Sequence, residues 1–134
     1  MSQTFYSHGK LLLTAEYVVL DGALALALPT KFGQSLTIYP IDEFKLKWKS
    51  LDEKGFVWFE ETYDFSECVF PFVFEYSTNS IEENRLSPEA KTLLSILYQA
   101  HKLNASFLSD YLDTEKGIEV TTKLDFPKNW GLGT

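Results

Sequence analysis

A short glycine loop, Gly131-Leu132-Gly133-Thr134, follows Pro127 in the sequence. Glycines let backbone amides approach a ligand without obstruction by a Cβ atom, and the threonine adds a hydroxyl group. In phosphate-binding loops a helix normally follows, and its N-terminal amides complete the anion site. Two glycines one residue apart also occur in ordinary turns, so the loop alone is weak evidence. Its position after an alternating strand and Phe126-Pro127 favours phosphate binding.

Two charged residues near the start of the sequence, Lys10 and Glu16, also have types suited to chemistry. Glu16 interrupts an otherwise apolar run, and a carboxylate in such a run needs a partner. Lys10 is the nearest candidate. A pair at the edge of a phosphate pocket would hold the ammonium where it meets phosphoryl oxygens. A simple ion pair that caps a sheet is an equally open interpretation of the same two residues.

Apolar runs and period-two alternation predict the strands that position these residues. Strands are expected at 11–14, 23–28, 34–39, 44–49, 56–59 and 118–124. The run at 11–14 is expected to be buried on both faces, and Pro29 is expected to end the strand at 23–28. Residues 34–60 are expected to form an antiparallel meander.

One helix has a clear start signal, with Ser87 as N-cap, Pro88 at the first helical position and an acid in the first turn. It is expected to end at about Lys102. Its apolar stripe, which would cover a sheet, consists of Ala90, Leu93, Leu94, Leu97 and Ala100. A weaker helical or irregular stretch is expected at 106–113, and residues 62–86 have no assignable pattern.

Composition restricts the class of protein. The 134 residues, 45% of them hydrophobic, suit one domain or part of one. A net charge of −7 disfavours a nucleic-acid partner, so an anionic ligand must be held locally. One cysteine, Cys68, and two histidines exclude an internal disulfide and a structural zinc set. No signal-peptide or bilayer-spanning pattern is visible, so a cytoplasmic protein without a membrane partner is expected.

A basic pattern in one expected strand has a simple explanation. Lys45, Lys47 and Lys49 alternate along 44–49, opposite Glu60 and Glu61. Such alternation is typical of the solvated face of a strand, and cross-strand partners of opposite charge favour this interpretation over a binding patch.

Two stretches together resemble the GHMP small-molecule kinases. The segment 7–22, which reads Ser-His-Gly-Lys-Leu-Leu-Leu-Thr-Ala-Glu-Tyr-Val-Val-Leu-Asp-Gly, is similar to the first motif of the mevalonate and phosphomevalonate kinase branch. The segment 127–134, Pro-Lys-Asn-Trp-Gly-Leu-Gly-Thr, resembles the beginning of the second motif, Pro-x-x-x-Gly-Leu-Gly-Ser-Ser. The resemblance covers residues 5–39 and 118–134, with the two motifs in the family's order.

This resemblance implies an α+β fold, with a sheet of the kind named after the second domain of a small-subunit ribosomal protein and helices packed on one face. Residues 1–134 would be the N-terminal part of the nucleotide-binding domain, and the remainder of that domain and a C-terminal domain would lie beyond them. Lys10 and Glu16 are the implied catalytic residues, with Glu16 positioning Lys10 near the transferred phosphoryl group. The implied ATP-binding residues are Pro127, Trp130, Gly131, Leu132, Gly133 and Thr134.

Departures from the motifs bear on the substrate. His8 replaces the usual proline, Ala15 the usual glycine and Thr134 the first serine of the second motif, and Tyr17 stands where mevalonate kinases usually have histidine. The implied cofactors are ATP and magnesium, whose protein ligands are expected beyond Thr134, so no metal ligand is predicted within the sequence.

The implied function is ATP-dependent transfer of the γ-phosphoryl group to a small mevalonate- or phosphomevalonate-like metabolite by the full-length protein. Residues 1–134 alone are expected to be inactive, because they supply only part of the machinery that positions and neutralises the phosphates. The C-terminal remainder is the expected partner, and a homodimer stays open. The alternative is a catalytically inactive nucleotide-binding or scaffolding member of the same fold.

Overall fold

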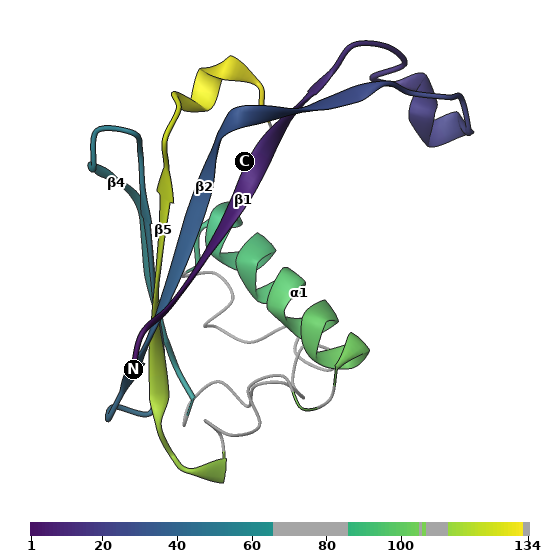
Figure 1. The fold of residues 1–134 in the computed structure, drawn as a ribbon. Helices are drawn as coiled ribbons and strands as arrows, with labels where there is room; N and C mark the ends of the chain where they lie inside the picture. The colour runs from purple at the N-terminus through teal and green to yellow at the C-terminus, as the bar shows by residue number, and fades with distance from the viewer. Residues whose placement is uncertain (66–85, 105, 107–112, 133–134) are drawn as a thin grey trace.

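The computed structural model describes residues 1–65, 86–104, 106 and 113–132. Within these ranges the chain has an α+β fold, in which a mixed five-stranded sheet carries one α-helix against one face (Figure 1). The elements are β1 (Gln3–Leu12), η1 (Val18–Asp21), β2 (Ala27–Ile41), β3 (Lys45–Leu51), β4 (Val57–Asp64), α1 (Pro88–Leu103), β5 (Gly117–Leu124) and η3 (Lys128–Trp130). The predicted α+β class is confirmed.

The sheet has the strand order β1-β2-β5-β3-β4. Strand β5 pairs antiparallel with β2 and parallel with β3, so it separates the two. The antiparallel meander expected at 34–60 is therefore wrong: β3 and β4 form the expected hairpin, but β2 is not the neighbour of β3. Period-two alternation identifies a strand and its faces, but it does not determine which distant strand will pair with it.

Strand β2 contains Pro29 in its interior, so the prediction that Pro29 ends a strand at 23–28 is also wrong. Proline lacks the amide that a central strand needs, but it is accepted where a strand is an edge or lies beside a bulge. Pairing with β5 begins only at Gln34, and β1 has a register shift between His8 and Lys10, opposite this part of β2. Pro29 thus has a neighbouring strand on one side only.

Beyond the sheet, β1 and β2 continue as a projecting hairpin with η1 near its tip, here called the arm (residues 10–30; Figure 1). Beyond the paired residues of β1 and β2, its two sides are joined by hydrogen bonds from Leu13 N to Leu26 O (2.8 Å) and from Leu26 N to Thr14 Oγ1 (3.0 Å). The burial expected for the run at 11–14 is wrong, because Leu11 is 45% exposed and Leu13 52% exposed. β1 ends at Leu12, and no described element covers these side chains.

Helix α1 forms as predicted. The Ser87 hydroxyl accepts a hydrogen bond from Ala90 N at 3.1 Å, which satisfies one free amide of the first turn. The predicted stripe faces the sheet: Ala90, Leu94 and Leu97 are buried, and the Tyr63 hydroxyl donates to Ala90 O at 3.0 Å. The main core consists of Leu46, Tyr63, Phe65, Ala90, Leu94, Leu97, Ile118 and Val120.

A second, smaller cluster lies beyond the end of β5 and consists of Leu124, Phe126 and Leu132. It anchors the chain as it leaves the sheet toward the glycine loop. Expectations for Cys68, most of 106–113, Gly133 and Thr134 concern residues outside the described ranges. No helix in the described part of the chain is both long enough and apolar enough to cross a membrane.

Candidate functional site

The two stretches singled out in the sequence meet at the C-terminal end of β1. The backbone amide of Lys10 donates a hydrogen bond to the carbonyl oxygen of Leu132 at 2.9 Å. Leu132, in the glycine loop, therefore lies against β1, at the residue predicted to carry the catalytic ammonium. Lys10 itself is exposed, so its side chain is accessible to a ligand at this edge.

Gly9 explains why the loop can come so close to β1. A Cβ atom at this position would lie 2.9 Å from Thr30 Oγ1, 3.0 Å from Leu132 O and 3.1 Å from Leu132 Cβ. These distances are shorter than ordinary van der Waals contact, so a larger residue would force β1 and the loop apart. The close contact between β1 and the loop requires glycine at position 9. The sequence alone did not predict this requirement.

The short helix η3 leads into the glycine loop, and within it the Trp130 amide donates a hydrogen bond to Pro127 O at 3.0 Å. Gly131 follows with a φ of 69°, in the left-handed region that glycine adopts without strain. Apart from its chain neighbours, no atom of the described residues lies within 4 Å of the position that a Cβ would take at Gly131, so these residues leave this face of the backbone open to a ligand. Leu132 differs, since its side chain is buried and only its backbone remains at the edge.

A carboxylate that the sequence analysis did not single out ties the end of β5 to β1 and β2. Asp125 Oδ1 accepts a hydrogen bond from Gly33 N at 2.6 Å, and Oδ2 accepts one from the Tyr6 hydroxyl at 2.6 Å. The Asp125 amide in turn donates to Gly33 O at 3.1 Å. We call Tyr6, Gly33 and Asp125 the clasp. The signal available in the sequence is an aspartate directly after a strand and before Phe126-Pro127.

The hydrogen bond within the clasp changes the titration of both partners. Donation from the Tyr6 hydroxyl, more than the amide of Gly33 and the charge of His8, lowers the pKa of Asp125, although some loss of solvation opposes the change. The same hydrogen bond raises the pKa of Tyr6, because ionising the phenol would place two negative charges in contact. Over the intervening pH range the pair consists of a neutral donor and a charged acceptor.

His8, the residue that departs from the motif proline, packs beside the clasp. Its ring makes an edge contact with Tyr6, with centroids 5.0 Å apart, and its Nδ1 donates to Thr30 O at 2.9 Å. His8 thus has a structural partner in β2 and supports the orientation of the Tyr6 ring.

The ion pair expected between Lys10 and Glu16 is not present in the described structure. Both residues are described, and none of the ion pairs formed there joins them. Glu16 is exposed in the turn that begins the tip of the arm, whereas Lys10 lies where β1 meets the loop. Ala15, just before Glu16, has a φ of 62°, which turns the chain away from the direction of β1.

Aromatic side chains surround the start of the loop. Trp130 makes an edge contact with Phe32, with ring centroids 5.5 Å apart, and it remains half exposed. The Lys128 ammonium lies 3.5 Å from the ring centroid of Trp58 on β4, a cation–π arrangement that links η3 to the β3–β4 hairpin. Pro127 and Trp130, both predicted to contact ATP, therefore lie in a segment that is held from two sides.

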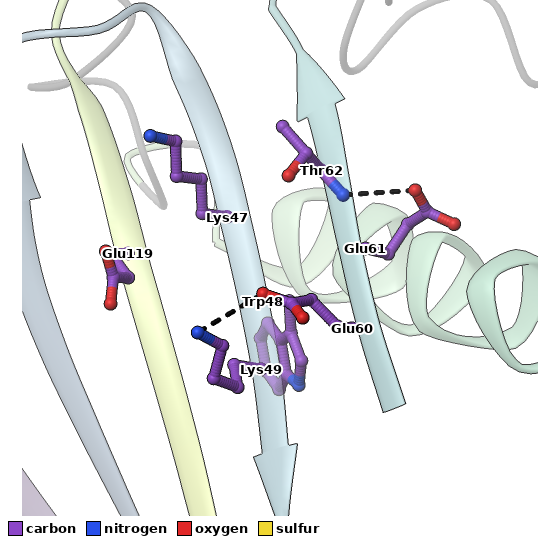
Figure 2. Close-up of a pocket in the computed structure, with 7 residues that line it drawn as sticks. All are labelled: Lys47, Trp48, Lys49, Glu60, Glu61, Thr62 and Glu119. Atoms are coloured by element: carbon purple, nitrogen blue, oxygen red, sulfur yellow. Dashed lines mark hydrogen bonds and ion pairs between the residues drawn. The ribbon is translucent and has the colours of Figure 1, made fainter. Parts of the chain in front are cut away.

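Lys47 and Lys49 of β3 lie on the sheet face opposite α1, where they line a shallow pocket with acidic residues of β4 and β5 (Figure 2). Lys49 Nζ lies 3.2 Å from Glu60 Oε1, its partner in the strand register. Lys47 pairs with Glu43, and Glu119 stands beside Lys47 in the register of β5. The interpretation as a solvated strand face with balanced charges is confirmed.

Within the described ranges, no three His, Cys, Asp or Glu side chains gather in a group that could hold a metal ion. Comparison of the chain with models of known protein families gave no match, and comparison with curated protein sequences gave none.

Proposed function

We propose that this chain is the nucleotide-binding part of an ATP-dependent small-molecule kinase of the GHMP type. The acceptor is a small mevalonate- or phosphomevalonate-like metabolite. The observation that carries the proposal is the hydrogen bond of 2.9 Å between Lys10 N and Leu132 O. It joins the two segments whose sequences resemble the first and second GHMP motifs, although they lie at opposite ends of the sequence.

Ala15 adds independent support. The motif resemblance has glycine at this position, and the φ of 62° at Ala15 is a conformation that favours glycine. The backbone geometry that a glycine would provide is thus retained although the residue has changed. A coincidental match of sequence letters gives no reason for a left-handed residue at this point.

The loop residues fit a phosphate group better than they fit a metal. Open space beside Gly131 and the exposed ammonium of Lys10 offer a backbone and a cation to phosphoryl oxygens. When bound, ATP supplies the phosphoryl group that is transferred. Magnesium has no fitting ligand set among the described residues, and we assign it no residue of this chain.

The role proposed for Lys10 is to stabilise negative charge on the transferred group, while Gly131 and the residues after it bind the phosphates. The Lys10 side chain can fill this role without disturbing the loop, because the loop is bound by the backbone amide of the same residue. The two contributions are therefore separable by mutation.

The test uses the full-length protein and the variant Lys10→Met, which retains the backbone amide. Phosphoryl transfer from ATP to a panel of small hydroxy acids and their phosphates should fall at least about 100-fold, consistent with loss of one electrostatic stabiliser. Lys54→Met, in the exposed turn between β3 and β4, is the matched control and should retain activity. A wild-type protein that neither binds ATP nor transfers phosphate would overturn the proposal.

A second candidate is an inactive nucleotide-binding or scaffolding protein of the same fold. The observation that favours it is the missing ion pair between Lys10 and Glu16, since an unfixed ammonium is poorly organised for catalysis. ATP binding without turnover across the same panel would support this candidate over the kinase.

A further inference from the structure

The clasp of Tyr6, Gly33 and Asp125 lies between the sheet and the candidate phosphate loop. We propose that Asp125 and Tyr6 are positioning residues that set the placement of Gly131 and Leu132 relative to Lys10, and thereby the affinity for the nucleotide phosphates. This inference rests on the proposed function. Neither side chain is assigned a contact with the ligand.

Asp125 is the first residue after β5, and its carboxylate fixes the direction in which the chain leaves the sheet by accepting hydrogen bonds from Tyr6 on β1 and Gly33 on β2. From there the chain passes through Phe126 and η3 to Gly131. Any rotation at Asp125 is carried into the loop, because few residues intervene.

Strand β1 receives the loop. Tyr6 and Lys10 both belong to β1, so the Tyr6–Asp125 bond and the Lys10–Leu132 bond connect the same strand to two ends of one segment. Because the segment 125–132 is bound to β1 at both ends, its position relative to β1 is fixed. If one of the two hydrogen bonds is removed, the segment can rotate about the other.

Positioning of the loop is separable from the stability of the domain. The Tyr6 side chain is on the surface, 49% exposed, whereas the apolar cluster below the loop contains Phe126 at 1%. Hydrogen bonds between exposed groups contribute little to the free energy of folding, since water replaces the lost partner. Loss of the Tyr6 hydroxyl should therefore shift the loop without unfolding the domain.

Backbone geometry gives the clasp its specificity. A Cβ atom at Gly33 would collide with the carbonyl oxygen of Ser7 and with the Tyr6 ring, so only glycine brings this amide close enough to donate to Asp125. Each oxygen of the Asp125 carboxylate thus accepts one hydrogen bond, Oδ1 from the backbone amide of Gly33 and Oδ2 from the side chain of Tyr6.

The experiment compares Tyr6→Phe, which removes one hydroxyl, with Tyr39→Phe, a matched change of an exposed tyrosine on β2. In the full-length protein, Tyr6→Phe should raise the KM for ATP about threefold to tenfold, the effect of a modest loss of binding free energy. It should leave kcat as in Tyr39→Phe and lower the thermal midpoint at neutral pH only slightly, because the lost hydrogen bond joins exposed groups. Asp125→Asn, which retains the oxygen facing Gly33, should have a smaller effect than Asp125→Ala.

A second readout needs no nucleotide. Amide hydrogen exchange of Trp130, whose amide is bonded to Pro127 O, reports on the order of the loop in the ligand-free protein. Exchange should be faster in Tyr6→Phe than in Tyr39→Phe. If the wild-type protein binds no nucleotide, the proposed function fails, and this exchange measurement alone decides whether the clasp orders the loop.

The inference is overturned by unchanged exchange at Trp130 in Tyr6→Phe, or by faster exchange with an unchanged KM in an active protein. A fall in the thermal midpoint together with kcat would also overturn it, because such a change indicates only a structural role.

Discussion

Gly9 lies so close to Leu132 that a Cβ atom added to the glycine would stand 3.0 Å from the leucine carbonyl oxygen. The glycine that precedes the predicted catalytic lysine is therefore a spacing element between β1 and the loop. This relationship leads directly to the first prediction.

Gly9→Ala should push the loop away from β1 and lower the free energy of unfolding by about 1 to 3 kcal/mol, the usual cost of overpacking. It should also weaken nucleotide binding, because the Lys10–Leu132 hydrogen bond is stretched. Urea denaturation and equilibrium binding of ATP measure the two effects. Full stability together with wild-type affinity in Gly9→Ala would contradict this account of the contact.

Gly33→Ala should be more damaging, because its Cβ would collide with the backbone oxygen of Ser7 in the paired strand. We expect a loss of about 3 kcal/mol or more, since a paired backbone cannot move aside as a flexible side chain can. Gly55→Ala is the comparison: Gly55 has a φ of 88° but open space around it, so only backbone strain of about 1 kcal/mol is expected. Equal losses in the two variants would refute the steric argument.

Ala15→Gly should not destabilise the protein. Alanine at a φ of 62° carries strain of about 1 kcal/mol, which glycine removes, although the greater freedom of glycine in the unfolded chain offsets part of the gain. The expected change in the free energy of unfolding lies between about 0 and +1 kcal/mol. Ala100→Gly in α1 should instead cost about 1 kcal/mol. A similar loss at Ala15 would mean that the left-handed conformation is not maintained in solution.

The clasp predicts a stability that depends on pH at both ends of the scale. On the acid side, the folded pKa of Asp125 lies below its ordinary value of 3.8, so its contribution is present above pH 3.8 and is lost as the pH falls through the lowered pKa. On the alkaline side, the folded pKa of Tyr6 lies above 10.0, so its contribution is present below pH 10.0 and is lost as the pH rises through the raised pKa.

Urea denaturation from acid to alkaline pH should therefore give a flatter acid limb for Asp125→Asn and a flatter alkaline limb for Tyr6→Phe than for the wild type. Glu43, whose pKa is lowered by Lys47, contributes to the acid limb in every variant, so only the difference from the wild type isolates Asp125. Parallel acid limbs in the wild type and Asp125→Asn would rule out the charged hydrogen bond.

Local signals in the sequence predicted the local structure well. Ser87, Pro88 and the apolar stripe specify α1 because capping and helical periodicity act within a few residues. The β3–β4 hairpin follows from the alternation of polar and apolar residues. The balance of charge between the lysines of β3 and the acidic residues of β4 follows from their opposite positions in the two strands.

Contacts between residues far apart in the sequence were harder to predict from the sequence. The position of β5 between β2 and β3 depends on pairing across most of the chain, and Pro29 is accepted only because β5 does not extend that far. The sequence predicted the loop and Lys10 as parts of one site, and the structure brings their backbones together. Asp125 was missed because a single aspartate after a strand has no pattern, and Glu16 was paired with Lys10 because their nearness in sequence hid the turn at Ala15.

The central position of β5 also has a consequence for how the protein is made. The β1–β2 and β3–β4 hairpins each form from nearby segments, but in the described sheet β5 is the strand that pairs with both, and it leaves the ribosome after them. Contacts between distant segments slow folding, because the intervening chain must be ordered first. We therefore expect the β1–β2 and β3–β4 hairpins to stay unpaired with each other during synthesis until β5 inserts between them. The candidate phosphate loop then takes its place in the same event that closes the sheet.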